Sequence, residues 1–214
     1  MRILITAGPT REPLDEVRYL ANRSSGRLGL AVAAEALSRG HEVVLLLGRG
    51  AVPPPASLED VCIPFDRTLE LQSLLQAHAP DCQLLLMAAA VADFIPEQAP
   101  SGHKYTRADG PPQLTLTPAP DLLAQLASTK KANQRFIGWA LEPKTSMMDR
   151  AAAKLRAKSL DAIVANPLET MDSQDITATL MTSDGGVWPT PGSMTKTAFA
   201  SWLMDHLDVP HLKI

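Results

Sequence analysis

A short polar segment, Ser24-Ser25-Gly26, precedes an apolar periodic stretch and contains residue types that bind phosphate. Backbone N–H groups at the start of a helix point towards an anion, and the helix dipole favours negative charge there. The serine hydroxyls add donors, and one of them also fits the N-cap of the helix. No Gly-Lys-Ser/Thr follows, so this is not a Walker A sequence, and Pro9 breaks the GxGxxG pattern after Gly8. We therefore expect a phosphate-binding turn of a different kind.

Three small residues and a carboxylate come at the end of another apolar run. Ala88-Ala89-Ala90 would let a ligand approach the backbone closely, and Asp93 follows at the same edge. Asp93 could bind Mg²⁺ together with nucleotide phosphates, or it could cap the following turn. The residues alone leave both interpretations open.

Three lysines could meet phosphates. Lys104 lies in a stretch rich in Pro, Gly, Lys and Arg, where a mobile lysine can close over a triphosphate. The residues alone favour a solvated loop lysine. Lys154 and Lys158 are four residues apart and share a helix face. That face contacts phosphates or is solvated, and a solvated face is the default expectation.

Two further side chains lie at or near the ends of predicted strands. Asn166 could bind a base or a phosphate, or it could be the turn residue before Pro167. Trp139 fits the core, although an aromatic ring near a strand end could also pack on a base.

The elements that must position these residues alternate along the chain. Strands are predicted at 3–7, 42–47, 82–90, 114–117, 136–141 and 162–165, and helices at 26–39, 68–78, 120–133, 147–158 and 194–207. The run at 82–90 is apolar almost throughout, which is typical of strands covered on both faces.

This alternation predicts an α/β fold of Rossmann-like, three-layer type, with a mostly parallel central sheet and helices on both faces. A long flap loop at about 94–113 and a C-terminal β-hairpin, 177–182 with 187–188, complete the prediction. Ligands of such sheets bind at the carboxyl ends of the strands, where Gly8, Ala89 to Asp93 and Asn166 come.

Bulk properties exclude several classes of protein. The 214 residues fit a single domain, 1–214, with a full core, and the formal net charge of −3 gives no global basic field for nucleic acid. Cys62 and Cys82 are too few for a disulfide framework and are not spaced for zinc. We find no secretory signal and no apolar run of about 20 residues, so we expect a cytoplasmic protein without a membrane span.

Taken together, these segments resemble phosphopantothenoylcysteine synthetase, the ligase of coenzyme A synthesis. The matching stretches follow the family order and cover most of the chain: Thr6 to Thr10 with Arg11-Glu12-Pro13, Asn22 to Gly26 with Gly29, Ala88 to Asp93, Pro120 to Leu123, Gly138 to Glu142, and Lys154 to Asn166. Thr-Arg-Glu-Pro followed by Asn-x-Ser-Ser-Gly is the most specific part. The chain departs from the family at Trp139, where phenylalanine is usual, and at Pro167, where aspartate is usual.

The resemblance implies a reaction in two steps. The carboxylate of phosphopantothenate attacks the α-phosphate of a nucleoside triphosphate, usually CTP in bacteria and here CTP or ATP, with Mg²⁺. The amine of L-cysteine then attacks the acyl-nucleotide. By resemblance, Lys104 serves the first step and Asn22 the second. Ser24, Ser25 and Gly26 match the turn that holds the substrate phosphate. The implied nucleotide-binding residues are Gly8, Ala89, Ala90, Asp93, Asp121, Trp139, Lys154, Lys158 and Asn166, with Asp93 also near the metal.

The resemblance also implies partners. The family usually forms homodimers, with the flap lysine near the active site of the partner subunit. In many bacteria the ligase follows a flavin-dependent decarboxylase. Because this chain starts at the first strand of the ligase, we expect a stand-alone enzyme without flavin and a separate phosphopantothenoylcysteine decarboxylase as its functional partner.

Two other functions remain open from the sequence. An NAD-dependent oxidoreductase needs an acidic residue after the second strand, where this chain has Leu47-Gly48-Arg49. Arg49 would suit the 2′-phosphate of NADP instead. A non-catalytic nucleotide-binding module of the same fold is the other alternative, because a fold does not fix a function.

Overall fold

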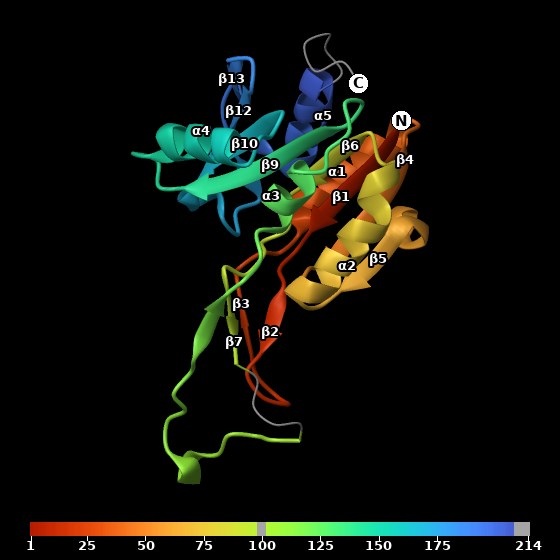
Figure 1. The fold of residues 1–214 in the computed structure, drawn as a ribbon. Coiled ribbons are helices and arrows are strands. Elements are labelled where there is room, and N and C mark those ends of the chain that lie inside the picture. The colour runs from red at the N-terminus through yellow and green to blue at the C-terminus, as the bar shows by residue number, and fades with distance from the viewer. Residues whose placement is uncertain (98–101, 208–214) are drawn as a thin grey trace.

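The computed structural model describes residues 1–97 and 102–207, and its centre is an eight-stranded sheet (Figure 1). The strand order is β13-β12-β10-β9-β6-β1-β4-β5. These strands are β1 (Arg2–Ala7), β4 (Glu42–Gly48), β5 (Cys62–Phe65), β6 (Leu84–Met87), β9 (Arg135–Glu142), β10 (Ala162–Pro167), β12 (Thr179–Thr182) and β13 (Val187–Pro189). The strands from β5 to β10 pair in parallel, and β12 and β13 form an antiparallel hairpin at the edge. The predicted sheet and hairpin are confirmed.

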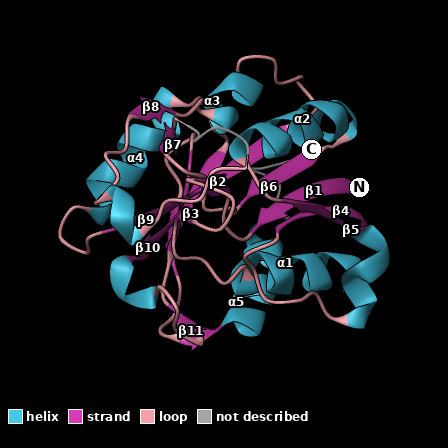
Figure 2. Cartoon of the chain, turned by 90° about the horizontal axis from the view of Figure 1, so that it is seen from below, coloured by secondary structure: helices cyan, strands magenta, loops and turns pink. Residues whose placement is uncertain are grey.

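Helices cover both faces of the sheet, as Figure 2 shows. Helices α1 (Arg27–Ser38) and α5 (Lys196–Leu207) lie on one side, and α2 (Thr68–His78), α3 (Leu122–Ala127) and α4 (Met147–Ala157) lie on the other. Each side has its own apolar cluster, and successive β1 side chains alternate between them: Ile3 and Ile5 join one cluster, Leu4 the other. The predicted three-layer fold is confirmed.

The order of the six parallel strands determines where a ligand can bind. Numbered along the chain, they run 3-2-1-4-5-6, with the order reversing between β1 and β6. At such a switch point the connections after the two strands leave towards opposite faces, which opens a crevice outside their carboxyl ends. The first strand ends at Ala7 and the fourth at Met87, so the segments after these residues border the crevice.

A slender arm extends from this edge of the sheet (Figure 1). It consists of the hairpin β2 (Arg11–Pro13) with β3 (Tyr19–Ala21) and the pair β7 (Phe94–Pro96) with β8 (Leu116–Pro118). The prediction of an irregular flap at 94–113 therefore needs correction, because its first residues form a strand. Residues 98–101 of the predicted flap lie outside the described residues. Lys104 lies on the arm, where Gly102 and Tyr105 donate backbone hydrogen bonds to the carboxylates of Glu16 and Asp15.

Several element boundaries differ from the prediction. The helix expected at 120–133 covers only Leu122–Ala127, and the strand expected at 82–90 covers only Leu84–Met87. The last helix begins at Lys196, after a short strand, β14 (Met194–Thr195), that pairs with β11 (Asp175–Ile176). Among the described residues, no helix has the length and apolar character required to cross a bilayer.

The Thr10-Arg11-Glu12 segment anchors the arm to the body of the protein. Glu12 is buried, and its carboxylate accepts hydrogen bonds from Thr68 N at 2.8 Å and Thr68 Oγ1 at 2.6 Å, at the start of α2. Arg11 pairs with Asp66 and lies over the ring of Tyr19. Glu12 therefore satisfies N-terminal donors of a helix 56 residues further along the chain.

We predict that Glu12→Ala lowers the free energy of unfolding by about 2–3 kcal/mol, because it leaves the Thr68 donors without an acceptor in a buried site. Urea titration of both proteins checks this, with exposed Glu59→Ala as the control that stays within about 0.5 kcal/mol. Equal stability of Glu12→Ala and the parent protein would contradict the anchoring role.

Candidate active site

A cavity of about 700 Å³ lies at the carboxyl edge of the sheet and brings together most of the predicted site residues. The predicted residues that line it are Asn22, Ser24, Ser25, Gly26, Ala89, Ala90, Asp93, Asp121, Trp139, Lys154, Lys158 and Asn166. Two predicted residues, Gly8 and Lys104, are not in its wall. The segments that contribute are far apart in the sequence and converge because parallel strands end at one edge.

Glycines shape the turn that leads into α1. Gly26 has φ 72°, in the left-handed region, and a Cβ there would lie 2.7 Å from the Cβ of Ala51. Buried Gly8 packs directly behind it, since the same Cβ would lie 3.3 Å from Gly8 N. Gly8 thus backs the turn and is not in the wall of the cavity, and its role in nucleotide binding stays a prediction. No side chain caps α1, so neither Ser24 nor Ser25 acts as its N-cap.

Gly29 lets α1 lie directly on β1. A Cβ on Gly29 would come 2.4 Å from the Cβ of Ala7. We predict that Gly29→Ala lowers the free energy of unfolding by about 1–3 kcal/mol, because overpacking must push the helix and its phosphate turn outwards. Gly192 has no atom within 4 Å of an added Cβ, so Gly192→Ala is the matched control. If thermal melting shows the two variants to be equally stable, the close packing is not required.

Hydrogen bonds fix the small-residue segment after β6. Ala89 N donates to Thr6 Oγ1 at 3.1 Å, and Ala92 N donates to Thr10 Oγ1 at 2.9 Å. Ala90 N donates to the Gly8 carbonyl at 2.9 Å. The segment is therefore held against the loop after β1, and its methyl side chains leave the backbone accessible from the cavity.

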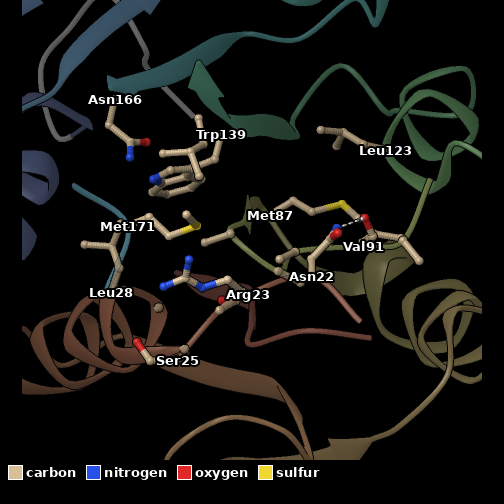
Figure 3. Close-up of a pocket in the computed structure, with 18 of the residues that line it drawn as sticks. Asn22, Arg23, Ser25, Leu28, Met87, Val91, Leu123, Trp139, Asn166 and Met171 are labelled. Atoms are coloured by element: carbon tan, nitrogen blue, oxygen red, sulfur yellow. Dashed lines mark hydrogen bonds between the residues drawn. The ribbon is translucent and has the colours of Figure 1, made fainter. Parts of the chain in front are cut away.

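Asn22 contacts this segment, and Asp93 follows it directly in the sequence. The Asn22 side chain donates from Nδ2 to the Val91 carbonyl at 2.8 Å, as Figure 3 shows. Asp93 is exposed at the cavity edge, and no described residue donates a hydrogen bond to its carboxylate. The described residues contain no group of three or more acidic, His or Cys side chains that could hold a metal. One free carboxylate fits Mg²⁺, which commonly takes one or two carboxylates plus substrate phosphates and water.

Ion pairs arrange the lysines on the far wall. Lys158 Nζ lies 2.9 Å from Asp121 Oδ2, and Lys154 Nζ lies 2.6 Å from Glu142 Oε1. Burial alone would raise the pKa of the Glu142 carboxyl group, but hydrogen bonds from Lys154 and Arg150 outweigh it and hold the pKa below its ordinary value. Asp121 has a lowered pKa through the same balance, with Lys158 as the main partner. Lys154 is in the last turn of α4 and Lys158 is its C-cap residue, and both line the cavity, as their predicted shared face requires.

Trp139 and Asn166 form a third part of the wall (Figure 3). Asn166 is 8% exposed, and its Nδ2 donates to Thr170 Oγ1 at 2.7 Å. The indole N–H of Trp139 is buried without a hydrogen-bond partner among the described residues. Trp139 is half-buried: it packs against one apolar cluster and also lines the cavity, so its ring can contact a ligand.

Several charged residues of the wall were missed by the sequence analysis. Arg23, Arg27, Asp172 and Lys196 all line the cavity near the start of α1. Arg23 and Arg27 flank Ser24-Ser25-Gly26, so basic residues beside a phosphate turn were an available signal. Asp172 and Lys196 belong to no recognisable motif, and only the fold brings them to the site.

Comparisons with known proteins identify the family of this chain. A family model described as "DNA/pantothenate metabolism flavoprotein C-terminal domain" matches residues 1–209. The "Coenzyme A biosynthesis bifunctional protein CoaBC" of Mycobacterium tuberculosis is 36% identical over 95% of this chain and 51% of its own length. A protein of an unknown prokaryotic organism, named "Cysteine/Cysteine sulfinic acid decarboxylase", is 40% identical over 78% of this chain and 46% of its own length. The chain thus spans about half the length of these relatives.

Solved structures show the same fold. The C-terminal domain of a CoaBC protein superposes with a TM-score of 0.78 at 32% identity, covering 96% of this chain and 93% of that one. A Cab2 variant in complex with phosphopantothenate-cysteine superposes with a TM-score of 0.77 at 18% identity, covering 97% and 86%, a likeness of fold. The family model spans nearly the whole chain, and the resemblance seen in the sequence is confirmed. The chain belongs to the family of DNA/pantothenate metabolism flavoprotein C-terminal domains, in which it resembles the phosphopantothenoylcysteine synthetases.

Proposed function

We propose that this chain joins phosphopantothenate to L-cysteine through an acyl-nucleotide, with CTP as the preferred nucleotide. The observation that carries the proposal is the convergence, in one cavity, of the phosphate turn, the small-residue segment with Asp93, and the two lysines at the C-terminal end of α4. Relatives named for coenzyme A biosynthesis support it, as does a Cab2 structure of similar fold that holds phosphopantothenate-cysteine.

The two ends of the cavity suit the two substrates. The turn at Ser24 to Gly26 offers N–H and hydroxyl donors for the phosphate of phosphopantothenate. Lys154 and Lys158, at the C-terminal end of α4, offer cations for nucleotide phosphates, and the Trp139 ring offers a surface for the base. The reacting carboxylate would then lie between these ends, beside the accessible backbone of Ala89 and Ala90.

The first step needs charge neutralisation. A carboxylate oxygen bonds to the α-phosphorus, and the P–O bond to the leaving pyrophosphate breaks with its electron pair. Mg²⁺, bound through Asp93 and the phosphates, would neutralise part of this charge. We assign the rest to Lys104, because a cation that arrives on a movable arm can stabilise the charge that develops on the pyrophosphate.

The second step forms the amide. The amine of L-cysteine attacks the acyl carbon and loses a proton, and the C–O bond to the nucleoside monophosphate breaks. Asn22 points its carboxamide towards this part of the cavity, held by the bond to Val91 (Figure 3). Its amide can orient the acyl group or the incoming amine, a task that requires a fixed donor.

A homodimer would complete the site. Lys104 is exposed on the arm and is absent from the wall of the cavity in its own chain. The arm also exposes large apolar side chains, namely Val17, Tyr19, Leu20, Phe94, Leu114 and Leu116. A patch of this kind favours burial against another surface. We therefore propose that the arms of two copies pack together and that each delivers Lys104 to the cavity of the other.

The proposed product has a carboxylate on its cysteine portion, so a separate phosphopantothenoylcysteine decarboxylase is the expected next enzyme.

The NADP alternative gains no support from the structure. A plain dinucleotide fold has a tight turn between its first strand and helix, whereas here that connection contains the β2–β3 hairpin.

The test is to incubate the protein with phosphopantothenate, L-cysteine, Mg²⁺ and either CTP or ATP, and to identify the products by mass spectrometry. The proposal predicts phosphopantothenoylcysteine and a nucleoside monophosphate, formed faster with CTP. Formation of the nucleoside diphosphate instead of the monophosphate would contradict an acyl-nucleotide route.

A further inference from the structure

One region of the cavity wall concentrates positive charge. Arg23, Arg27 and Lys196 line it together, next to the turn at the start of α1. Asp172 is the carboxylate of this region, and it pairs with Arg23. Two of the three cations, Arg27 and Lys196, therefore face the cavity without an ion-pair partner among the described residues.

The surroundings of Lys196 disfavour its positive charge. It is the first residue of α5, where the helix dipole disfavours a cation, and the first turn contains no acidic residue. Its side chain is partly buried, and no described residue accepts a hydrogen bond from its ammonium group. Burial lowers the pKa of Lys196, the charge of Arg27 lowers it further, and Asp172 opposes them.

One bound anion would offset the helix dipole, the partial burial and the repulsion by Arg27 that act on Lys196. An anion placed between Lys196 and Arg27 relieves their mutual repulsion and restores hydrogen bonds to a partly dehydrated ammonium. It also complements the positive N-terminal ends of α1 and α5. These two helices pack against each other. The turn at Ser24 to Gly26 borders the same space, so the anion that fits best is a phosphate group with several acceptor oxygens.

We propose that Lys196 and Arg27 bind the terminal phosphate monoester of the acid substrate, and that Lys196 makes the site select a phosphorylated acid over its unphosphorylated form. Naming that substrate phosphopantothenate rests on the proposed function, whereas the phosphate subsite does not. Lys196 binds the phosphate and takes no part in the reaction of the carboxylate.

The test compares the binding of phosphopantothenate and pantothenate by calorimetry, without nucleotide, to the parent protein, Lys196→Gln and Lys196→Arg. Loss of a charge-assisted contact predicts a roughly 10- to 100-fold higher Kd of Lys196→Gln for phosphopantothenate. The Kd for pantothenate should stay unchanged, and Lys196→Arg should recover most of the affinity. The control is Lys144→Gln, an exposed lysine outside the cavity wall. Unchanged phosphopantothenate affinity in Lys196→Gln, or an equal loss for both ligands, overturns the proposal.

A second probe separates this inference from the proposed function. Inorganic phosphate is titrated into the parent protein and Lys196→Gln, and binding is followed by the shift in Tm. Stabilisation by phosphate that is lost in Lys196→Gln supports the subsite even if no ligase product forms. Equal stabilisation of both proteins counts against it even if the ligase reaction is found. Melting without ligand shows whether Lys196→Gln is folded.

Discussion

Lys104→Gln is expected to lower kcat for amide formation by about 10²–10³-fold while leaving the fold intact. Lys104 is exposed on the arm and contributes to no core, so its removal has no route to global unfolding. The loss arises because the charge that develops on the leaving pyrophosphate is no longer neutralised. Steady-state pyrophosphate release gives kcat, and thermal melting gives stability, with Lys144→Gln as the control. Near-parental kcat in Lys104→Gln would show that this lysine has no part in the first step.

Mixing two inactive variants tests whether Lys104 acts on the partner subunit. Lys104→Gln retains Asn22, and Asn22→Asp retains Lys104, so a mixed dimer has one complete site only if the arm reaches across. Equal amounts, allowed to exchange subunits, should recover about a quarter of the parental sites. If each arm serves its own cavity, no mixed dimer contains a complete site, and activity stays absent.

Asn22→Asp is expected to stop the reaction after the first step, so that the acyl-nucleotide accumulates to about the concentration of active sites. Asn22 donates to the Val91 carbonyl, and a carboxylate cannot. The substitution also places a negative charge near the phosphates. Amide formation should fall by about 10²-fold or more.

Rapid quenching and mass spectrometry would detect the accumulated acyl-nucleotide. The matched control is Asn133→Asp, since Asn133 is exposed and outside the cavity wall. An Asn22→Asp protein that makes the full amide product at the parental rate, with no intermediate, would rule out this role.

The body of the fold was predictable because its elements have strong local patterns. The buried strands β1, β4 and β9 are apolar runs, and α2 has the predicted bounds of Thr68–His78. The arm was not predictable in the same way. Its strands β2 and β3 have three residues each, and they exist because they pair with each other, not because of their local sequence. Strand β5 contains Pro64, which is tolerated because β5 is at the edge of the sheet.

The residues of the candidate site that lie at strand ends were predictable from the sequence. Asp93 and Asn166 come after β6 and within the end of β10, and the parallel topology brings such positions together. Lys196 was missed because it lies 169 residues after Arg27, and only the packing of α5 on α1 makes them neighbours. Gly8 was assigned to the ligand because the motif contains it, and the structure places it behind the turn, outside the wall of the cavity. Glu12 likewise belongs to the motif and stabilises α2.

Activation of the acid substrate by a nucleotide releases pyrophosphate, so pyrophosphate release is the measurement to make. The assay contains phosphopantothenate, L-cysteine and Mg²⁺, with CTP and ATP in parallel, and phosphopantothenate is omitted in the control. We expect pyrophosphate release that requires phosphopantothenate and is faster with CTP. Without L-cysteine, the parent protein should release about one pyrophosphate per site and then stop. No release with either nucleotide, or release that does not depend on phosphopantothenate, would show that this protein does not activate phosphopantothenate with a nucleotide.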